Sequence, residues 1–556
     1  MTSPRPTGAT MDLLLRNGTL IDGTGSPARA ADVAVAADRI VAVRRRGEIE
    51  PDRGAQVVDL DGLVLTPGFI DVHTHYDAQI LWDADLTPSG WHGVTSVIMG
   101  NCGFGIAPTL PRHRDLVVRL LENVEGMSMD ALNAGIDWCF ETFPEYVAAI
   151  DRRSKRLNVG VFMGHSPLRM FVMDGEERPA TPDEVATMQR LLREAIGAGA
   201  IGFSTSRAPQ HQGAFGRPVP SRFSDVEEVY ALASVLGDLH KGVLQVAIGP
   251  GLFIEQFSEL SVKYGIPVTW TALLARAERR GGAARTVERA SALPGEVYPQ
   301  LACREIVMQV NLGDPSPLAE VDEWKEVLAR PREARPELYR DAGWRDRARQ
   351  PTLERWSHRW ERMEVQETTH HQDATGIPLA RLAAERGTTP FDLMIDLALD
   401  DEMSTRFRVV MDNDGYDEVG DLLADKRTLL GLSDAGAHAS QLCDACFSTH
   451  LLAHWVRERK SLPLEDAVWR LTGHPHQAFR LADRGLAREG FYADLVAFDP
   501  DTVAITAPER VYDQPGGADR LVVRSTGIEH MWVNGQAVRR AGAELDDVAP
   551  GRLIRS

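Results

Sequence analysis

Residues 67–75, Pro-Gly-Phe-Ile-Asp-Val-His-Thr-His, constrain this chain more than any other stretch. An apolar run leads into two histidines, His73 and His75, which are separated by one residue. In a strand, side chains at i and i+2 point to the same side, so both imidazoles aim at one point. Imidazole is a ligand that suits zinc, nickel and iron. An apolar strand that ends in such ligands is typical of the C-terminal mouth of a (β/α)8 barrel, and we predict a metal site there.

After His75 the chain alternates short apolar strands with amphipathic helices. This alternation indicates an α/β fold with a parallel sheet or barrel. One helix begins after Pro182 and repeats its apolar residues at helical spacing. The first of eight expected strands ends at the two histidines, and the others cover residues 94–100, 159–164, 200–205, 243–248, 266–271, 298–303 and 429–434.

Both ends of the chain have a different sequence pattern, one typical of β-strands. Residues 11–66 and 484–556 contain short apolar runs separated by Gly and Asp, and Asn534-Gly535 is a strong hairpin signal. We expect the two ends to pair into one small composite β-sandwich domain beside a TIM-like barrel over residues 67–483. Between strands seven and eight, about residues 315–425 are rich in Arg, Glu and Trp. A structureless loop of that length would be unusual, so we predict a helical insertion near the barrel mouth.

The composition disfavours several classes of partner. The formal net charge is −19, and a protein so acidic repels the phosphates of nucleic acids and of anionic membranes. No uncharged apolar run approaches the roughly 18 residues of a membrane span, and no signal peptide is visible at the N-terminus. Five cysteines, an odd number, favour a reducing compartment. We predict a cytoplasmic enzyme that binds neither nucleic acid nor membrane.

Further motifs lie at the expected strand ends. They are Gly93-Val94-Thr95-Ser96-Val97, Gly100-Asn101-Cys102-Gly103-Phe104, Gly164-His165-Ser166 and Ser433-Asp434-Ala435-Gly436. With the stretch at residues 66–77, these motifs resemble the amidohydrolase superfamily, and more narrowly the N-acyl-D-amino-acid deacylases, or D-aminoacylases. The resemblance covers nearly the whole chain. The histidine string is highly specific for the superfamily, and Asn-Cys-Gly is fairly specific for the deacylase branch.

The resemblance implies a zinc-dependent hydrolase of amide bonds. In that family His73 and His75 would be zinc ligands, and Cys102 would be a thiolate ligand, often in place of the carbamylated lysine of other amidohydrolases. Asp434 would be both ligand and general base. Thiolate and imidazole are compatible ligands in one tetrahedral zinc site. The pKa of a water molecule bound to such a zinc ion is about 7. Two structural alternatives stay open: Asp434 as a helix N-cap and Cys102 as an ordinary buried thiol.

The sequence also departs from the D-aminoacylases, which place further histidine ligands at the ends of strands five and six. Here those positions carry Gln245-Val246-Ala247 and Trp270-Thr271-Ala272. We therefore expect one zinc ion held by the two histidines, Asp434 and Cys102, while a second ion lacks evident ligands. Other histidines that could substitute are His165, His211 and His438.

Several residues are candidates for contacts with substrate. His165, at the mouth of strand three, could stabilise the developing oxyanion and so act in catalysis. His438, four residues after Asp434, could face the same pocket. Arginine suits a substrate carboxylate because it pairs in a bidentate manner. The arginines placed near strand ends are Arg169, Arg207 and Arg304, and Gln245 is a further substrate-binding candidate.

Three functions follow from this reading. The first is a metal-dependent deacylase of N-acyl-D-amino acids or related peptide-like substrates. The second is a mononuclear amidohydrolase that acts on a cyclic amide or another C–N bond. The third is a binding protein on a catalytically decayed amidohydrolase scaffold, since fold analogy alone does not separate these functions. The expected partner is a small-molecule amide, and homo-oligomer formation is left open.

Overall fold

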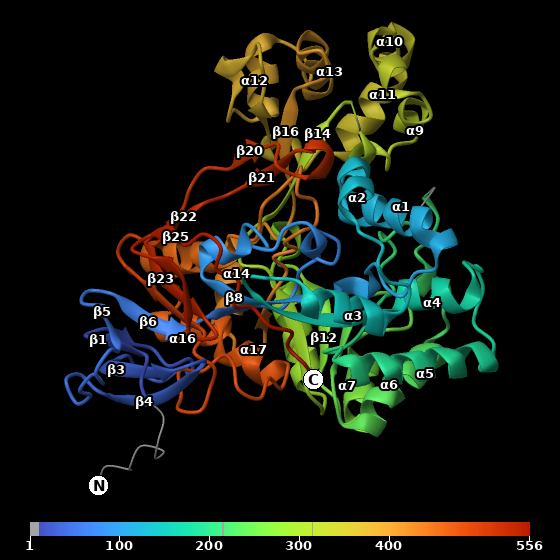
Figure 1. Cartoon of the computed structure of the whole chain (residues 1–556). Helices are drawn as coiled ribbons and strands as arrows, with labels where there is room; N and C mark the ends of the chain where they lie inside the picture. The colour runs from blue at the N-terminus through green and yellow to red at the C-terminus, as the bar shows by residue number, and fades with distance from the viewer. Residues whose placement is uncertain (1–9, 214–215, 314) are drawn as a thin grey trace. The chain divides into compact units, whose positions relative to one another are not determined.

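The structure of the chain is a computed structural model, which describes residues 10–213, 216–313 and 315–556. The chain divides into two compact units. The second unit is Glu305–Asp414, and the first contains the rest of the chain on either side of it. Figure 1 shows the whole chain coloured from its N-terminus to its C-terminus.

The first unit contains a parallel eight-stranded sheet that curls into a TIM-like barrel, as predicted. Its strand order follows the chain from β7 to β13 and then β17. The strands are β7 Phe69–Asp71, β8 Val94–Met99, β9 Asn158–Gly164, β10 Gly202–Ser206, β11 Val243–Ala247, β12 Val268–Leu273, β13 Val297–Leu301 and β17 Leu429–Leu430. Each predicted strand is therefore present, within a few residues of its expected bounds.

The barrel closes where its first and last strands meet. Just beyond β7 and β17, Thr74 forms a parallel bridge with Ala435, and the His75 amide donates to the Ala435 carbonyl at 2.7 Å. The chain segments that carry the predicted ligands are thus hydrogen-bonded to each other. Deeper in the barrel, inward-facing apolar residues from several strands fill the interior, among them Ile70, Val72, Ile98, Phe162, Val243 and Leu429.

Helices cover the outside of the barrel. Green helices α5, α6 and α7 lie beside one another in Figure 1, and they pack pairwise in sequence order. The helices of this unit are α1 Arg114–Glu125, α2 Met129–Gly135, α3 Phe143–Arg152, α4 His165–Met173, α5 Pro182–Ala198, α6 Val226–Leu239, α7 Ile254–Tyr264, α8 Gly282–Ser291, α14 Tyr416–Ala424, α15 Phe447–His450, α16 Leu464–Leu471 and α17 Gly473–Ala478.

The two ends of the chain share one sheet, as expected for a composite β-domain. Strand β18 (Leu495–Phe498) pairs with β6 (Val64–Pro67), so the red and blue ends of the chain meet in Figure 1. The other strands of this sheet are β1 Leu13–Arg16, β2 Thr19–Leu20, β3 Arg29–Ala36, β4 Arg39–Arg45, β5 Gln56–Asp59, β23 Ile528–Val533, β24 Gln536–Arg540 and β25 Ala543–Glu544. The sheet lies in the same compact unit as the barrel. That residues 11–66 and 484–556 form a domain of their own stays a prediction.

The insertion corrects one part of the sequence reading. It covers Glu305–Asp414 rather than about 315–425, and it is not purely helical. A three-stranded antiparallel sheet, β14-β16-β15, accompanies helices α9 to α13. Its elements are β14 Ile306–Asn311, α9 Asp322–Leu328, α10 Arg335–Arg340, α11 Ala342–Arg355, β15 Met363–Glu367, α12 Leu379–Arg386, α13 Pro390–Asp400 and β16 Arg406–Asp412. This unit has its own core of four tryptophans with aliphatic residues, and its expected place at the barrel mouth stays a prediction.

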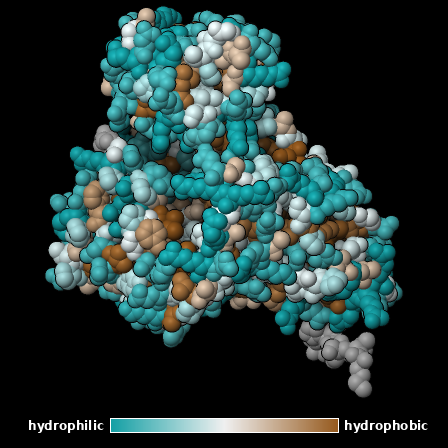
Figure 2. Space-filling view, turned by 180° about the vertical axis from the view of Figure 1, so that it is seen from behind, coloured by the Kyte–Doolittle hydropathy of each residue, from teal (hydrophilic) through white to brown (hydrophobic). Residues whose placement is uncertain are grey.

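The surface is mainly hydrophilic. Figure 2 shows one face, on which teal residues predominate and brown ones form scattered patches. Among the described residues, the exposed large hydrophobic side chains are Val57, Leu116, Phe253, Val262 and Tyr512. Within the same residues, no helix has both the length and the apolar character needed to pass through a bilayer.

Candidate metal centre

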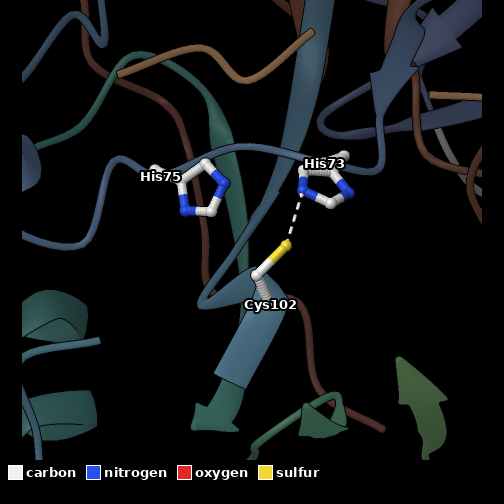
Figure 3. Close-up of side chains that lie close together, drawn as sticks. All are labelled: His73, His75 and Cys102. Atoms are coloured by element: carbon white, nitrogen blue, oxygen red, sulfur yellow. Dashed lines mark hydrogen bonds between the residues drawn. The ribbon is translucent and has the colours of Figure 1, made fainter. Parts of the chain in front are cut away.

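Three metal-ligating side chains meet at the mouth of the barrel. His73 and His75 follow β7, and Cys102 lies in the short turn that follows β8. One ligand atom from each of the three lies within 4.8 Å of the others, and all three residues are buried. Figure 3 shows the Cys102 sulfur directed toward the His73 ring, with His75 on the other side. Among the described residues, these three form the one such group of His, Cys, Asp or Glu side chains.

Asp434 adds a carboxylate to this group. Its Oδ1 lies 3.3 Å from His73 Nε2 and 3.6 Å from His75 Nε2. The Cys102 Sγ lies 3.4 Å from His73 Nε2. A tetrahedral zinc ion with bonds of about 2.0 Å to N or O and about 2.3 Å to S would hold its ligand atoms about 3.3–3.6 Å apart. These three separations match those between donor atoms around one zinc-sized ion.

Both imidazoles present Nε2 to this point because their Nδ1 atoms have other partners. His73 Nδ1 lies 2.7 Å from Gln300 Oε1, and Gln300 donates its own amide N–H to Thr269. The Gln300 oxygen is therefore the acceptor, and the His73 proton is on Nδ1. His75 Nδ1 lies 3.3 Å from the carboxylate of Glu125, the last residue of α1. Such outer partners fix the tautomer and the orientation of ligating histidines.

The electrostatics favour the metal-binding forms of the other two donors. Burial by itself raises the pKa of the Cys102 thiol, but the imidazoles of His73 and His75 bring this pKa down to about 6. Thiolate is the form that binds metals. Removal from bulk water raises the pKa of Asp434, but the hydrogen bond from His75 and the charges of both histidines hold it well below its usual range. Both groups are thus anionic at neutral pH.

The backbone at the site adopts unusual conformations. Cys102 and Asp434 have φ values of 57° and 46°, in the left-handed region that non-glycine residues seldom occupy. Such strain is found mainly where surrounding structure holds a functional side chain in place. Two residues after Asp434, Gly436 has a φ of 96°, and a Cβ there would lie 2.7 Å from the His75 carbonyl oxygen. This close approach requires glycine between the two ligand-bearing segments.

A cavity opens beside Asp434. Its lining includes Gln79, Leu442 and Arg520. A neighbouring cavity shares Gln79, Gly436 and Ala439 with the first and is also lined by Trp82, Met127 and Leu132. Asp434 therefore borders a cavity whose lining has both polar and apolar parts.

A comparison of the sequence with known protein families identifies the family of this chain. Residues 56–539, most of the chain, match the Amidohydrolase family. The chain belongs to this family. In this amidohydrolase the pair His73 and His75 lies where the barrel strands place the other donors.

Individual proteins within the family are also similar to this chain. The D-aminoacylase of Alcaligenes xylosoxydans xylosoxydans is 30% identical, over 95% of this amidohydrolase and 94% of that protein. The crystal structure of the N-acyl-D-glutamate deacylase of Bordetella bronchiseptica, complexed with zinc and a phosphonate inhibitor, is 26% identical with a TM-score of 0.68. A D-aminoacylase structure described for its binuclear metal center is 27% identical, also with a TM-score of 0.68. Both structures match over 98% of this chain and 100% of theirs.

Two predicted site residues are paired with other side chains in this amidohydrolase. His165 uses both ring nitrogens away from the ligands, with Thr205 Oγ1 at 2.8 Å and Glu228 Oε1 at 2.8 Å. Arg169 pairs with the same Glu228 carboxylate, and all three side chains are buried. Both ring nitrogens of His165 are thus paired with other side chains, and Arg169 is engaged in a buried ion pair, so their roles toward substrate stay predictions.

The other arginines are also engaged. Arg304 contacts the Asp444 carboxylate and Cys446, and Arg207 donates to the Ser224 and Pro250 carbonyls. The arginine that lines the cavity beside Asp434 is instead Arg520, which forms a bidentate pair with Asp513.

Two histidines do lie near the ligands. His438 and His211 both interact electrostatically with His75 and Asp434, and burial lowers the pKa of each imidazole. The His438 amide donates to the carbonyl of Glu125, which ties the loop after Asp434 to the end of α1. His438 therefore stays a candidate for contact with substrate.

The sequence analysis did not identify Glu125 and Gln300, the partners of the Nδ1 atoms of the two imidazoles. Glu125 ends a helix far from any recognised motif, and no local pattern distinguishes it from neighbouring acidic residues. Gln300 lies within an expected strand, two residues after Tyr298, whose side chain packs with the inward-facing barrel core. Period-two alternation would place Gln300 on the inner face and could have identified it.

Proposed function

We propose that this chain is a metal-dependent hydrolase that cleaves the amide bond of N-acyl-D-amino acids. The observation that carries the proposal is the meeting of two imidazoles and a low-pKa thiol in one buried group, with the ionised carboxylate of Asp434 at 3.3 Å and 3.6 Å from the two imidazoles. The D-aminoacylase and deacylase relatives support the substrate class. An intact donor set also weighs against a decayed binding protein.

The donors suit zinc, for which thiolate and imidazole are preferred ligands. His73 and His75 would bind through Nε2, Cys102 through its thiolate and Asp434 through Oδ1. We propose one ion, because the described residues offer one such group. Bound there, zinc would supply Lewis acidity toward the amide carbonyl and lower the pKa of a water molecule.

The protein residues handle the protons of the reaction. Hydrolysis forms a bond between the carbonyl carbon and the water oxygen and breaks the C–N bond. Asp434, ionised and open to the cavity, accepts the proton that the attacking water loses. It then returns this proton to the leaving nitrogen, which departs as the amine of the free amino acid. Glu125 and Gln300 keep the two imidazoles in position during these steps.

A substrate screen tests the proposal. The zinc-loaded protein is incubated with N-acetyl-D- and N-acetyl-L-amino acids, and free amino acid is quantified. We expect release from the D-series and little from the L-series. Hydrolysis of cyclic amides without release from any N-acyl amino acid would favour the second function. The cytoplasmic location and a homo-oligomer stay predictions.

A further inference from the structure

Gln245 has an unusual position beside the thiolate ligand. It lies on β11 and is fully buried, and its Oε1 accepts a hydrogen bond from the backbone N–H of Cys102 at 2.6 Å. The turn that carries Cys102 is also held by Ser204 on the next strand, which accepts from the Gly103 amide and donates to the Gly100 carbonyl. Two neighbouring inward-facing residues thus fix this turn.

This hydrogen bond fixes the orientation of the Gln245 amide. A backbone N–H can only donate, so the atom that faces it must be the carboxamide oxygen. The amino group, attached to the same carbon, consequently lies next to the Cys102 turn as well. Nothing in this arrangement allows the nitrogen and oxygen to be exchanged.

The Gln245 amino group has no partner. Its Nε2 is buried and forms no hydrogen bond with any described residue. Leaving a buried donor unsatisfied is unfavourable, and nearly all such groups in proteins are paired. Holding the Cys102 turn requires only the oxygen. The amino group therefore needs another explanation, and an acceptor atom brought by a ligand supplies one.

We propose that Gln245 is a catalytic residue whose Nε2 donates a hydrogen bond to the carbonyl oxygen of the amide substrate as that oxygen becomes negatively charged. The inference rests on the proposed hydrolase function. Gln245 Nε2 is a fixed hydrogen-bond donor beside the Cys102 turn. The carbonyl oxygen of an amide attacked at the metal-binding group must lie close to this turn. Preorganised donors of this kind are a major source of transition-state stabilisation.

The neighbouring strand supports this assignment. Thr271 Oγ1, on β12, lies 3.9 Å from the Cys102 sulfur. Cys102 is therefore bordered by a carboxamide at its backbone amide and by a hydroxyl near its sulfur, and both are neutral groups that are poor zinc ligands. A D-aminoacylase of similar structure is described as having a binuclear metal center. In this chain the hydrogen-bond donor Gln245 lies beside Cys102, where the neighbouring side chains do not offer ligands for a second metal ion.

Two substitutions separate catalysis from support of the Cys102 turn. Gln245→Glu keeps an oxygen to accept from the Cys102 amide but removes the donor, and Gln245→Met removes both. We expect each variant to lose about 10²–10³-fold in kcat on N-acetyl-D-methionine, the usual effect of removing one oxyanion donor, with KM changed less than about threefold. Gln189→Glu, at a glutamine on helix α5, is the matched control and keeps wild-type kcat.

A second readout does not depend on turnover. Affinity for N-methylphosphonyl-D-methionine, a tetrahedral mimic, falls by the same factor as kcat/KM, while zinc content and the cobalt–thiolate absorption stay at wild-type values. Wild-type kcat in Gln245→Glu, or loss of the cobalt–thiolate band together with activity, overturns the inference and leaves Gln245 as a support for the turn. A wild-type protein inactive on every N-acyl amino acid instead overturns the proposed function.

Discussion

At the residue scale, the site depends on a small number of side chains that lie far apart in the sequence. The histidine pair, Cys102 and Asp434 were predictable because each follows a strand of a parallel barrel, and such strand ends converge. Their outer partners were not predictable in the same way. Glu125 reaches His75 from the end of a helix, and only the packing of that helix brings the two together.

Asp434→Asn tests the proton transfer. Asparagine keeps the size of the side chain but cannot accept the proton of the attacking water, and it is a weaker metal ligand. We expect kcat to fall by about 10²–10⁴-fold, the range typical of general acid–base groups. Steady-state kinetics at saturating zinc measure this. Asp238→Asn, at an aspartate outside the site on helix α6, is the control, and a similar kcat in both variants would refute the assigned role.

Glu125→Gln tests the orientation of His75. Burial raises the pKa of Glu125 to about 8 although the charge of His75 lowers it, and an amide cannot become the anionic acceptor of the His75 Nδ1 proton as this carboxyl group can. We expect metal affinity to fall by about 10–100-fold, as for other outer partners of histidine ligands. Competition with a zinc-binding dye measures this affinity. Glu122→Gln, on the exposed face of the same helix, should leave it unchanged, and equal affinities of both variants would exclude the role.

At the element scale, the strands were predictable because their apolar runs are short and bounded by turn residues. The last barrel strand is only Leu429–Leu430, shorter than expected, because the backbone turns into the left-handed region at Leu432 and Asp434. The three-stranded sheet of the insertion was missed. Two of its strands alternate apolar with polar or charged residues over part of their length, as in Met363–Glu367, and the Arg- and Glu-rich surroundings favoured helix.

Helix α5 provides a test at this scale. Thr181 and Glu184 form a capping box at its start, in which each side chain accepts from the backbone amide of the other. Thr181→Ala removes one of these bonds and should lower the free energy of unfolding by about 1 kcal/mol, with activity unchanged. Urea unfolding measures the difference. Thr187→Ala, within the same helix, keeps both caps and should not destabilise it, so equal losses would contradict the explanation.

At the scale of the whole molecule, the two compact units have separate hydrophobic cores. The ligands all belong to the first unit. Removing the metal should therefore destabilise that unit alone, since a ligand present at 100 times its dissociation constant contributes about 2.7 kcal/mol to the state that binds it. We expect calorimetry to show two transitions, of which a chelator lowers only one. A single transition that shifts as a whole would contradict independent units.

The central claim is that one ion is bound by two imidazoles, one thiolate and one carboxylate. Zinc K-edge X-ray absorption of the purified protein tests it most directly. The account predicts one sulfur neighbour at about 2.3 Å with nitrogen and oxygen neighbours at about 2.0–2.1 Å. The sulfur shell should disappear in Cys102→Ser and persist in Cys139→Ser, where the cysteine is exposed and is not part of the donor group. A wild-type spectrum without sulfur, or one that Cys102→Ser leaves unchanged, would contradict the account.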